Sequence, residues 1–120
     1  MPSELDAFLG EHCSLTKRQM EVLSLQIDAQ NTIRDGSKTE RPHITSGVAE
    51  GSYYRVLSQA RQNIDQALYT MLLCSRMGIL QGEDLNRLLK LISRAPSELP
   101  GDPKEVISLV DALVRKIVML

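Results

Sequence analysis

The sequence predicts an all-α protein, and three observations lead to this prediction. Apolar residues recur at helical spacing in the long segments of the chain, as from Met20 to Ile27 and from Val106 to Val118. Gly and Pro residues, which interrupt helices, fall between these segments. Hydrophobic residues make up 42% of the 120 residues but aromatic residues only 3%, so aliphatic side chains must fill the core.

The first two helices are expected near the N-terminus. Ser3 can cap a short helix that weakens at Gly10. Thr16 and Gln19 then fit a capping box. In this motif the Thr16 hydroxyl accepts a hydrogen bond from the Gln19 amide, and the Gln19 side chain reaches back to the Thr16 amide. The second helix should run from this box to about Gln30.

Residues 31–46 contain turn and breaker residues, and they allow two structures. Asp35-Gly36 can turn a small inserted β-hairpin within residues 31–46. Alternatively, the same residues form a basic loop. Pro42 can open a short helix that reaches about Ala49.

Three further helices are expected after this segment. The longest should run from about Ser52 to Met77, where Gly78 supplies a left-handed cap. An amphipathic helix should cover residues 83–93. A linker rich in Pro and Gly follows, and the last helix should begin near Pro103.

The C-terminal helices carry more apolar surface than a small domain covers by itself. We therefore expect residues 66–120 to form a helical dimerisation region and residues 1–65 to form a separate binding region. Burying a large aliphatic side chain contributes roughly 1.5–3 kcal/mol, so several of them can drive association. The residues expected at the dimer interface are Leu72, Val106, Leu109, Val110, Leu113, Val114 and Ile117.

The charge is unevenly distributed along the chain. The net charge of −1 argues against a protein that coats nucleic acid nonspecifically, because such proteins are usually basic. Residues 1–16 contain acids but no Lys or Arg, whereas residues 34–61 contain more bases than acids. The net-positive region therefore coincides with the start of the longest expected helix and the segment before it.

The start of the longest helix carries side chains suited to reading DNA in the major groove. Arg55, Gln59 and Gln62 lie four and three residues apart, so they share one helix face. Arg can bind guanine O6 and N7, and Gln can bind adenine N6 and N7; alternatively, these side chains form an ordinary solvated face. Of the adjacent Tyr53 and Tyr54, one is expected to be a core residue. The residues expected to contact DNA are Lys17, Arg18, Arg34, Lys38, Arg41, Ser52, Tyr53, Tyr54, Arg55, Ser58, Gln59, Arg61 and Gln62.

Two segments resemble parts of known helix-turn-helix domains. Residues 15–23, Leu-Thr-Lys-Arg-Gln-Met-Glu-Val-Leu, resemble the opening helix of sigma-factor region 4 and LuxR-type domains. Residues 55–64, Arg-Val-Leu-Ser-Gln-Ala-Arg-Gln-Asn-Ile, are similar to the reading helix and exit of archaeal Tfx-type and sigma-like regulators. The resemblance implies a helix-turn-helix DNA-binding domain within residues 15–70.

The interval between these two segments departs from the pattern. Helix-turn-helix domains of this group place an unbroken supporting helix there, whereas this chain has a longer interval that contains Gly36 and Pro42. Either the supporting helix is shortened to about residues 42–49, or a hairpin has been inserted.

No motif in the sequence indicates an enzyme. The sequence contains no Gly-rich phosphate loop, His-x-x-x-His motif or paired-carboxylate motif. Cys13 and Cys74 are too far apart to build a local metal site, and we expect them to be reduced structural thiols. We therefore expect no enzyme activity, no metal and no cofactor.

The predicted location is the cytoplasm. No apolar run reaches the roughly 18 residues of a membrane span, and the N-terminus lacks the basic and apolar regions of a signal peptide. These observations predict a soluble protein without membrane contact.

The sequence thus predicts a transcriptional regulator that binds double-stranded DNA sequence-specifically as a homodimer. The alternative is a non-catalytic helical protein–protein interaction module that does not bind DNA. Both predict oligomerisation, and they differ in whether the face of Arg55, Gln59 and Gln62 binds DNA. No recognisable motif indicates the operator sequence or the effector. None indicates whether the protein activates or represses transcription.

Overall fold

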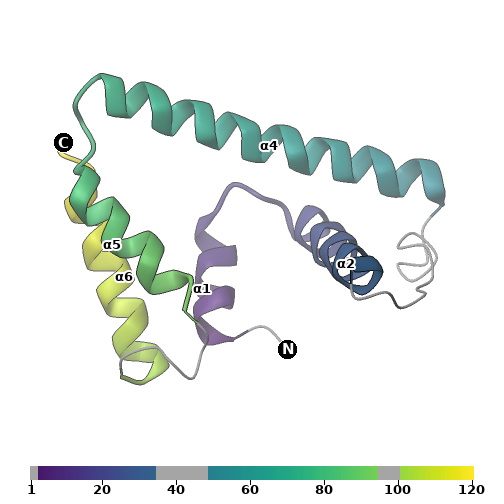
Figure 1. Cartoon of the computed structure of the whole chain (residues 1–120), viewed down its shortest axis with the longest axis horizontal. Helices are drawn as coiled ribbons and strands as arrows, with labels where there is room; N and C mark the ends of the chain where they lie inside the picture. The colour runs from purple at the N-terminus through teal and green to yellow at the C-terminus, as the bar shows by residue number, and fades with distance from the viewer. Residues whose placement is uncertain (1–2, 35–48, 95–100) are drawn as a thin grey trace. The chain divides into compact units, whose positions relative to one another are not determined.

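The computed structural model describes residues 3–34, 49–94 and 101–120, and these ranges are almost entirely helical (Figure 1). Their helices are α1 (Glu4–His12), α2 (Lys17–Arg34), α4 (Glu50–Arg76), α5 (Gly82–Ile92) and α6 (Pro103–Ile117). The β-structure of the described ranges is limited to one antiparallel bridge between Leu80 and Val118. The predicted all-α fold class is confirmed. None of the described helices is both long enough and apolar enough to cross a bilayer.

The predicted β-hairpin is not seen. Residues 31–34, its expected first arm, form the last turn of α2, which continues past Gln30. Asn31 and Thr32 each cost a helix less than about 0.7 kcal/mol relative to Ala, which is too little to end an established helix. The rest of the hairpin segment and the short helix expected from Pro42 lie outside the described residues.

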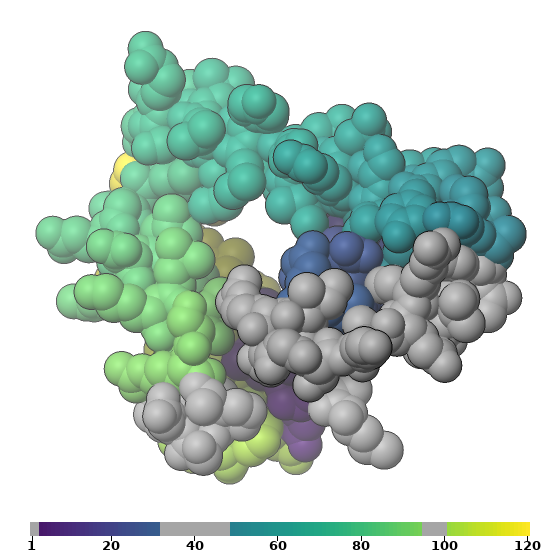
Figure 2. Space-filling view, turned by 45° about the vertical axis from the view of Figure 1, so that its right-hand side comes forward, coloured from purple at the N-terminus to yellow at the C-terminus, as the bar shows by residue number. Residues whose placement is uncertain are grey.

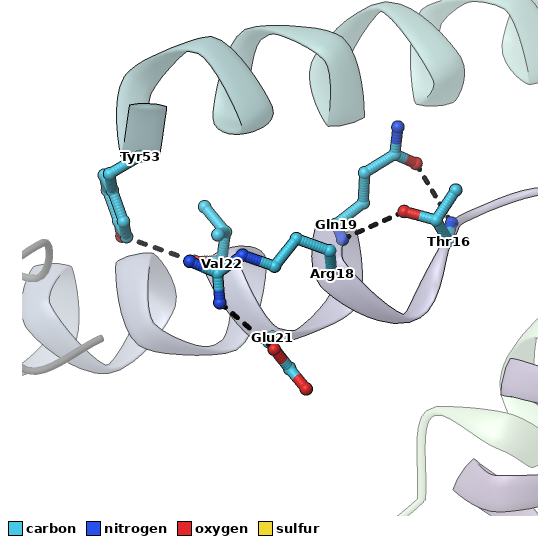
Figure 3. Close-up of polar contacts among 6 residues, drawn as sticks. All are labelled: Thr16, Arg18, Gln19, Glu21, Val22 and Tyr53. Carbon is cyan, nitrogen blue, oxygen red and sulfur yellow. Dashed lines mark hydrogen bonds and ion pairs between the residues drawn. The ribbon is translucent and has the colours of Figure 1, made fainter. Parts of the chain in front are cut away.

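Local capping fixes several helix ends. At the start of α2, Thr16 Oγ1 accepts from the Gln19 amide and Gln19 Oε1 accepts from the Thr16 amide, both at 3.1 Å (Figure 3). This reciprocal pair is the predicted capping box. Asp102 caps α6 by accepting from the Glu105 amide at 2.9 Å. Gly78, with a φ of 77°, follows α4 as the expected left-handed residue.

The chain divides into two compact units. Unit 1 consists of Met1–His12 with Leu68–Leu120, and unit 2 consists of Cys13–Ala67. The first helix, α1, packs against α6, because Leu5 enters the same core as the C-terminal helices.

Unit 1 is built around an aliphatic core that α1, α5 and α6 share. The separation of four residues between Val106 and Val110 places both on the inward face of α6, and the separation of three between Leu88 and Leu91 does the same on α5. Phe8 and Leu85 are among the half-buried residues that pack around this core. The buried core residues are Leu5, Leu88, Leu91, Val106, Val110 and Ile117.

Polar interactions fasten α6 to α5 and to the segment before α5. Residues 79–81 pair with residues 117–119 through two backbone hydrogen bonds of 2.9 Å. The buried carboxylate of Asp84 lies 3.5 Å from Lys116 Nζ and 3.8 Å from Arg87 Nη1. A buried carboxylate is costly unless a cation lies close to it, so this placement of Lys116 favours the observed packing of α6 on α5.

Burial in the core of unit 1 contradicts the prediction of a dimer interface for some of its residues. Val106, Val110 and Ile117 are buried within the protomer, so they cannot contact a second copy. They face inward because α6 packs one of its apolar stripes on α1 and α5. Leu113 is half-buried against the same core. The exposed members of the predicted set are Leu72, Leu109 and Val114.

Candidate nucleic-acid interface

Unit 2 holds the N-terminal half of α4 against α2. Val22 on α2 and both Tyr53 and Ala60 on α4 have no exposed surface. The two helices run antiparallel here, because Tyr53 near the start of α4 meets Val22, whereas Asn63 farther along α4 meets Gln19 near the start of α2. Ala60 lies between these two contacts along α4 and is fully buried.

Tyr53 anchors the start of α4. Its hydroxyl donates to the Val22 carbonyl oxygen at 3.3 Å and to Gln26 Oε1 at 3.2 Å, and Figure 3 shows the contact with Val22. Burial raises the pKa of the Tyr53 hydroxyl above its usual value of 10.0, and the adjacent Tyr54 adds to this shift. Tyr53 is the core member of the tyrosine pair. A buried hydroxyl cannot reach DNA, so the prediction that Tyr53 contacts DNA is wrong.

The raised pKa of Tyr53 predicts a pH-dependent stability. The folded protein retains the hydroxyl proton at pH values where the unfolded chain loses it, so the stabilisation is complete below about pH 10 and is lost as the pH rises through the folded pKa. Urea unfolding of the wild type and of Tyr53→Phe between about pH 8 and about pH 11 measures this effect. The wild type should lose more free energy of unfolding above about pH 10 than Tyr53→Phe. Equal losses would contradict the burial of this hydroxyl.

Asn63, which is not among the predicted site residues, connects α4 to the start of α2. Its Nδ2 donates to the Ser14 carbonyl oxygen at 2.8 Å and to Gln19 Oε1 at 3.2 Å. The Ser14 hydroxyl donates to Asn63 Oδ1 at 2.7 Å. The capping-box glutamine therefore also contacts α4. A polar residue three positions after the inward-facing Ala60 was the pattern that could have revealed this contact.

The opposite side of α4 carries the polar side chains selected from the sequence. Arg55, Gln59 and Gln62 are all exposed. At about 100° of rotation per residue, they point away from the side on which Tyr53 and Ala60 are buried. Figure 2 shows side chains of α4, in teal, at the surface of the molecule. A helix that reads the major groove needs this combination of an anchored inner face and an open polar outer face.

Arg61 and Tyr54 belong to a different side of α4. They line a groove between α2 and α4 within unit 2, with a volume of about 440 Å³. Leu23 and Ile27 of α2 and Leu57 of α4 supply its apolar walls. Arg61 and Tyr54 therefore lie on a different side of α4 from Arg55, although all three are predicted DNA contacts.

The remaining predicted contacts are scattered. Arg18 Nη1 forms an ion pair of 3.2 Å with Glu21 (Figure 3), and Arg18 Nη2 is buried without a hydrogen-bond partner among the described residues. Lys17 is exposed in the first turn of α2 and Arg34 ends that helix. Ser52 is half-buried and Ser58 is exposed on α4. Lys38 and Arg41 lie outside the described residues.

The described residues contain no cluster of three or more His, Cys, Asp or Glu side chains that could hold a metal ion. Cys13 is exposed and Cys74 is half-buried. Comparison with protein-family models, with curated proteins and with solved structures finds no match for this chain. The class of molecule that emerges is an all-helical protein with an anchored, polar-faced helix, and α4 is its candidate interface.

Proposed function

We propose that this protein is a cytoplasmic regulator that binds double-stranded DNA sequence-specifically as a homodimer. The observation that carries this proposal is the division of α4 into two faces. Tyr53 and Asn63 fix its inner face to α2 through hydrogen bonds, while Arg55, Gln59 and Gln62 remain exposed on its outer face. Preorganised donors and acceptors on a rigid helix are what direct base readout requires.

The exposed face matches the dimensions of a short DNA half-site. Residues 55 to 62 span about 10 Å along a helix that rises 1.5 Å per residue, which corresponds to about three base pairs. Arg55 fits a guanine through two parallel hydrogen bonds, and Gln59 or Gln62 fits an adenine. Ser58 is exposed but lines the same groove as Arg61 and Tyr54, and from there it can donate a hydrogen bond to a phosphate.

The low charge of the chain determines how strongly one copy can bind. Phosphate contacts from Lys and Arg supply most of the affinity of a DNA-binding protein. The net charge of −1 leaves few such contacts for a single copy, although Lys17 and Arg34 are candidates together with the predicted Lys38 and Arg41. A homodimer doubles both the phosphate contacts and the base contacts, so we expect tight binding only at paired half-sites.

Substitution of Arg55 tests the base-reading role. On a site selected from a random DNA pool, Arg55→Ala should weaken binding by about 1–3 kcal/mol and relax the preference at one base position. Fluorescence anisotropy with the selected duplex and with single-base variants measures both effects. The matched control is Arg94→Ala, which removes the same charge from an exposed residue of unit 1. Arg55→Ala binding that equals that of Arg94→Ala would overturn the role assigned to Arg55.

A second candidate function is a helical protein–protein interaction module without DNA binding. Leu68, Tyr69 and Leu72 each expose more than half of their surface on α4. Large apolar side chains that lie together at the surface often mark a protein–protein interaction site. A dimer that fails to bind any duplex at low salt would favour this candidate over the DNA-binding proposal.

A further inference from the structure

Unit 2 gathers its exposed apolar side chains in one place. Among the side chains of this unit that the structure describes, the large apolar ones that are exposed are Ile27, Tyr54 and Ile64, at 52%, 44% and 39%. All three line the groove between α2 and α4, and the half-buried Leu23 and Leu57 line it as well. Exposed apolar surface that gathers in a hollow marks a binding site more often than scattered apolar residues do.

The groove has the size and length of a site for a small molecule. Its volume of about 440 Å³ falls within the range of about 300–1,000 Å³ that is usual for ligand pockets. Tyr54 and Arg61, which both line it, are nearly two helical turns or about 10 Å apart along α4. Leu57 lies between them on the same side of the helix. An elongated ligand of about this length can therefore contact Arg61 with one end and apolar side chains with the rest.

Arg61 gives the groove an uncompensated positive charge. Its guanidinium forms no ion pair with any described residue. The described residues that line the groove include neither an Asp or Glu nor a second Lys or Arg. A guanidinium binds a carboxylate through two parallel hydrogen bonds. A phosphate monoester carries nearly two negative charges at pH 7, so a single cation matches a carboxylate better than a phosphate.

The α2 side of the groove adds amide donors. Gln26 and Gln30 both line the groove. Gln26 Oε1 accepts from the Tyr53 hydroxyl at 3.2 Å, and this hydrogen bond holds the side chain in place. The amide nitrogens of these two residues can donate to an oxygen of a bound ligand. A few polar groups among mostly aliphatic walls are typical of a site that fixes one polar end of an apolar molecule.

We propose that this groove binds a small aliphatic carboxylic acid, with the carboxylate on Arg61 and the alkyl chain along Leu57 toward Ile27 and Tyr54. The inference goes beyond the proposed function, because the binding needs neither DNA nor a second copy of the chain. It assigns Arg61 and Tyr54 to a ligand within unit 2, on a different side of α4 from Arg55.

Octanoate is a suitable probe, because its extended chain has about the length of the groove. Isothermal titration calorimetry of the full chain without DNA should show saturable binding of octanoate. Octanamide, which has the same length without the charge, should bind at least about tenfold more weakly, because it loses the charge-assisted hydrogen bonds to Arg61. Amide NMR shifts caused by octanoate should concentrate at residues 23–30 and 54–64.

Arg61→Gln should weaken octanoate binding about tenfold for the same reason. The matched control is Arg94→Gln, which removes an exposed charge from unit 1 and should leave the octanoate affinity unchanged. Arg61 is itself exposed, so its substitution should leave the fold intact, and circular dichroism verifies this for both variants.

Three results would each overturn the proposal. The first is the absence of saturable octanoate binding to the wild type at concentrations up to about 10 mM, the weak end of specific affinities. The second is equal affinity for octanoate and octanamide, or equal octanoate affinity of Arg61→Gln and Arg94→Gln. The third is a set of NMR shifts that lies in unit 1. The measurements contain no DNA, so the proposed function stands or fails independently of them.

Discussion

Tyr53→Ala should destabilise unit 2 by roughly 3–5 kcal/mol, the usual cost of removing a large buried ring from a core. Tyr53 has no exposed surface, and it is the largest fully buried side chain of the described residues. Its loss leaves a cavity between α2 and α4 and removes the hydrogen bond to the Val22 carbonyl oxygen. Because α4 depends on this contact for its position, we expect DNA binding to be lost as well.

Two further substitutions separate the contribution of the Tyr53 ring from that of its hydroxyl. Tyr53→Phe keeps the ring and removes only the hydroxyl, so it should cost no more than about 1.5 kcal/mol. Tyr54→Ala changes the same residue type at a position that is 44% exposed, and it should cost much less than Tyr53→Ala. Urea unfolding, with amide hydrogen exchange across unit 2, measures each change. A Tyr53→Ala protein as stable as Tyr54→Ala would show that Tyr53 does not anchor α4.

Val110→Asp should unfold unit 1. Val110 is only 1% exposed, in the core that α1, α5 and α6 form. A carboxylate placed there would be buried without a compensating charge, which costs roughly 4 kcal/mol or more. The substitution also removes apolar contacts with the neighbouring helices, so thermal unfolding should show the loss of the transition that belongs to unit 1.

Leu109→Asp is the matched control for Val110→Asp. Leu109 is the adjacent residue of α6 and is 43% exposed. The same charge there can remain in water, so we expect a stability change within about 1 kcal/mol. If Val110→Asp stayed folded and merely lost its self-association, Val110 would belong to a dimer interface and the placement of the core would be wrong.

The helix ends that the sequence predicted well depend on local interactions. The box of Thr16 and Gln19 closes within four residues, and Gly78 needs only its own freedom to adopt a positive φ. The end of α2 was not predicted, because Asn31 and Thr32 are weak helix formers and not strong breakers. Tertiary packing decides such a boundary, and a single sequence does not show that packing.

The inward face of α6 could not be predicted from its own residues. The helix has apolar side chains on more than one side, so both Val110 and Leu109 were candidates for an interface. The choice depends on Leu5, which lies far away in the sequence and packs against only one of these sides. Amphipathic spacing identifies a buried face only when the other face is clearly polar.

The candidate interface was predicted in part. The exposure of Arg55 and Gln59 follows from the apolar spacing on the opposite side of α4, and the structure agrees. The choice between Tyr53 and Tyr54 as the buried residue required the position of α2. Asn63 was missed because a polar side chain at an inward position is recognised only when its partner on the neighbouring helix is known.

The most direct test of the proposed function is the salt dependence of duplex DNA binding by the full chain. Fluorescence anisotropy with a mixed duplex pool, and then with a selected site, should show saturable binding whose log affinity falls linearly with log salt. The Arg55→Ala, Gln59→Ala double variant should keep its fold and its dimer but lose the preference for the selected site. Failure of the intact dimer to bind any duplex at low salt, or unchanged site preference in the double variant, would contradict DNA reading by α4.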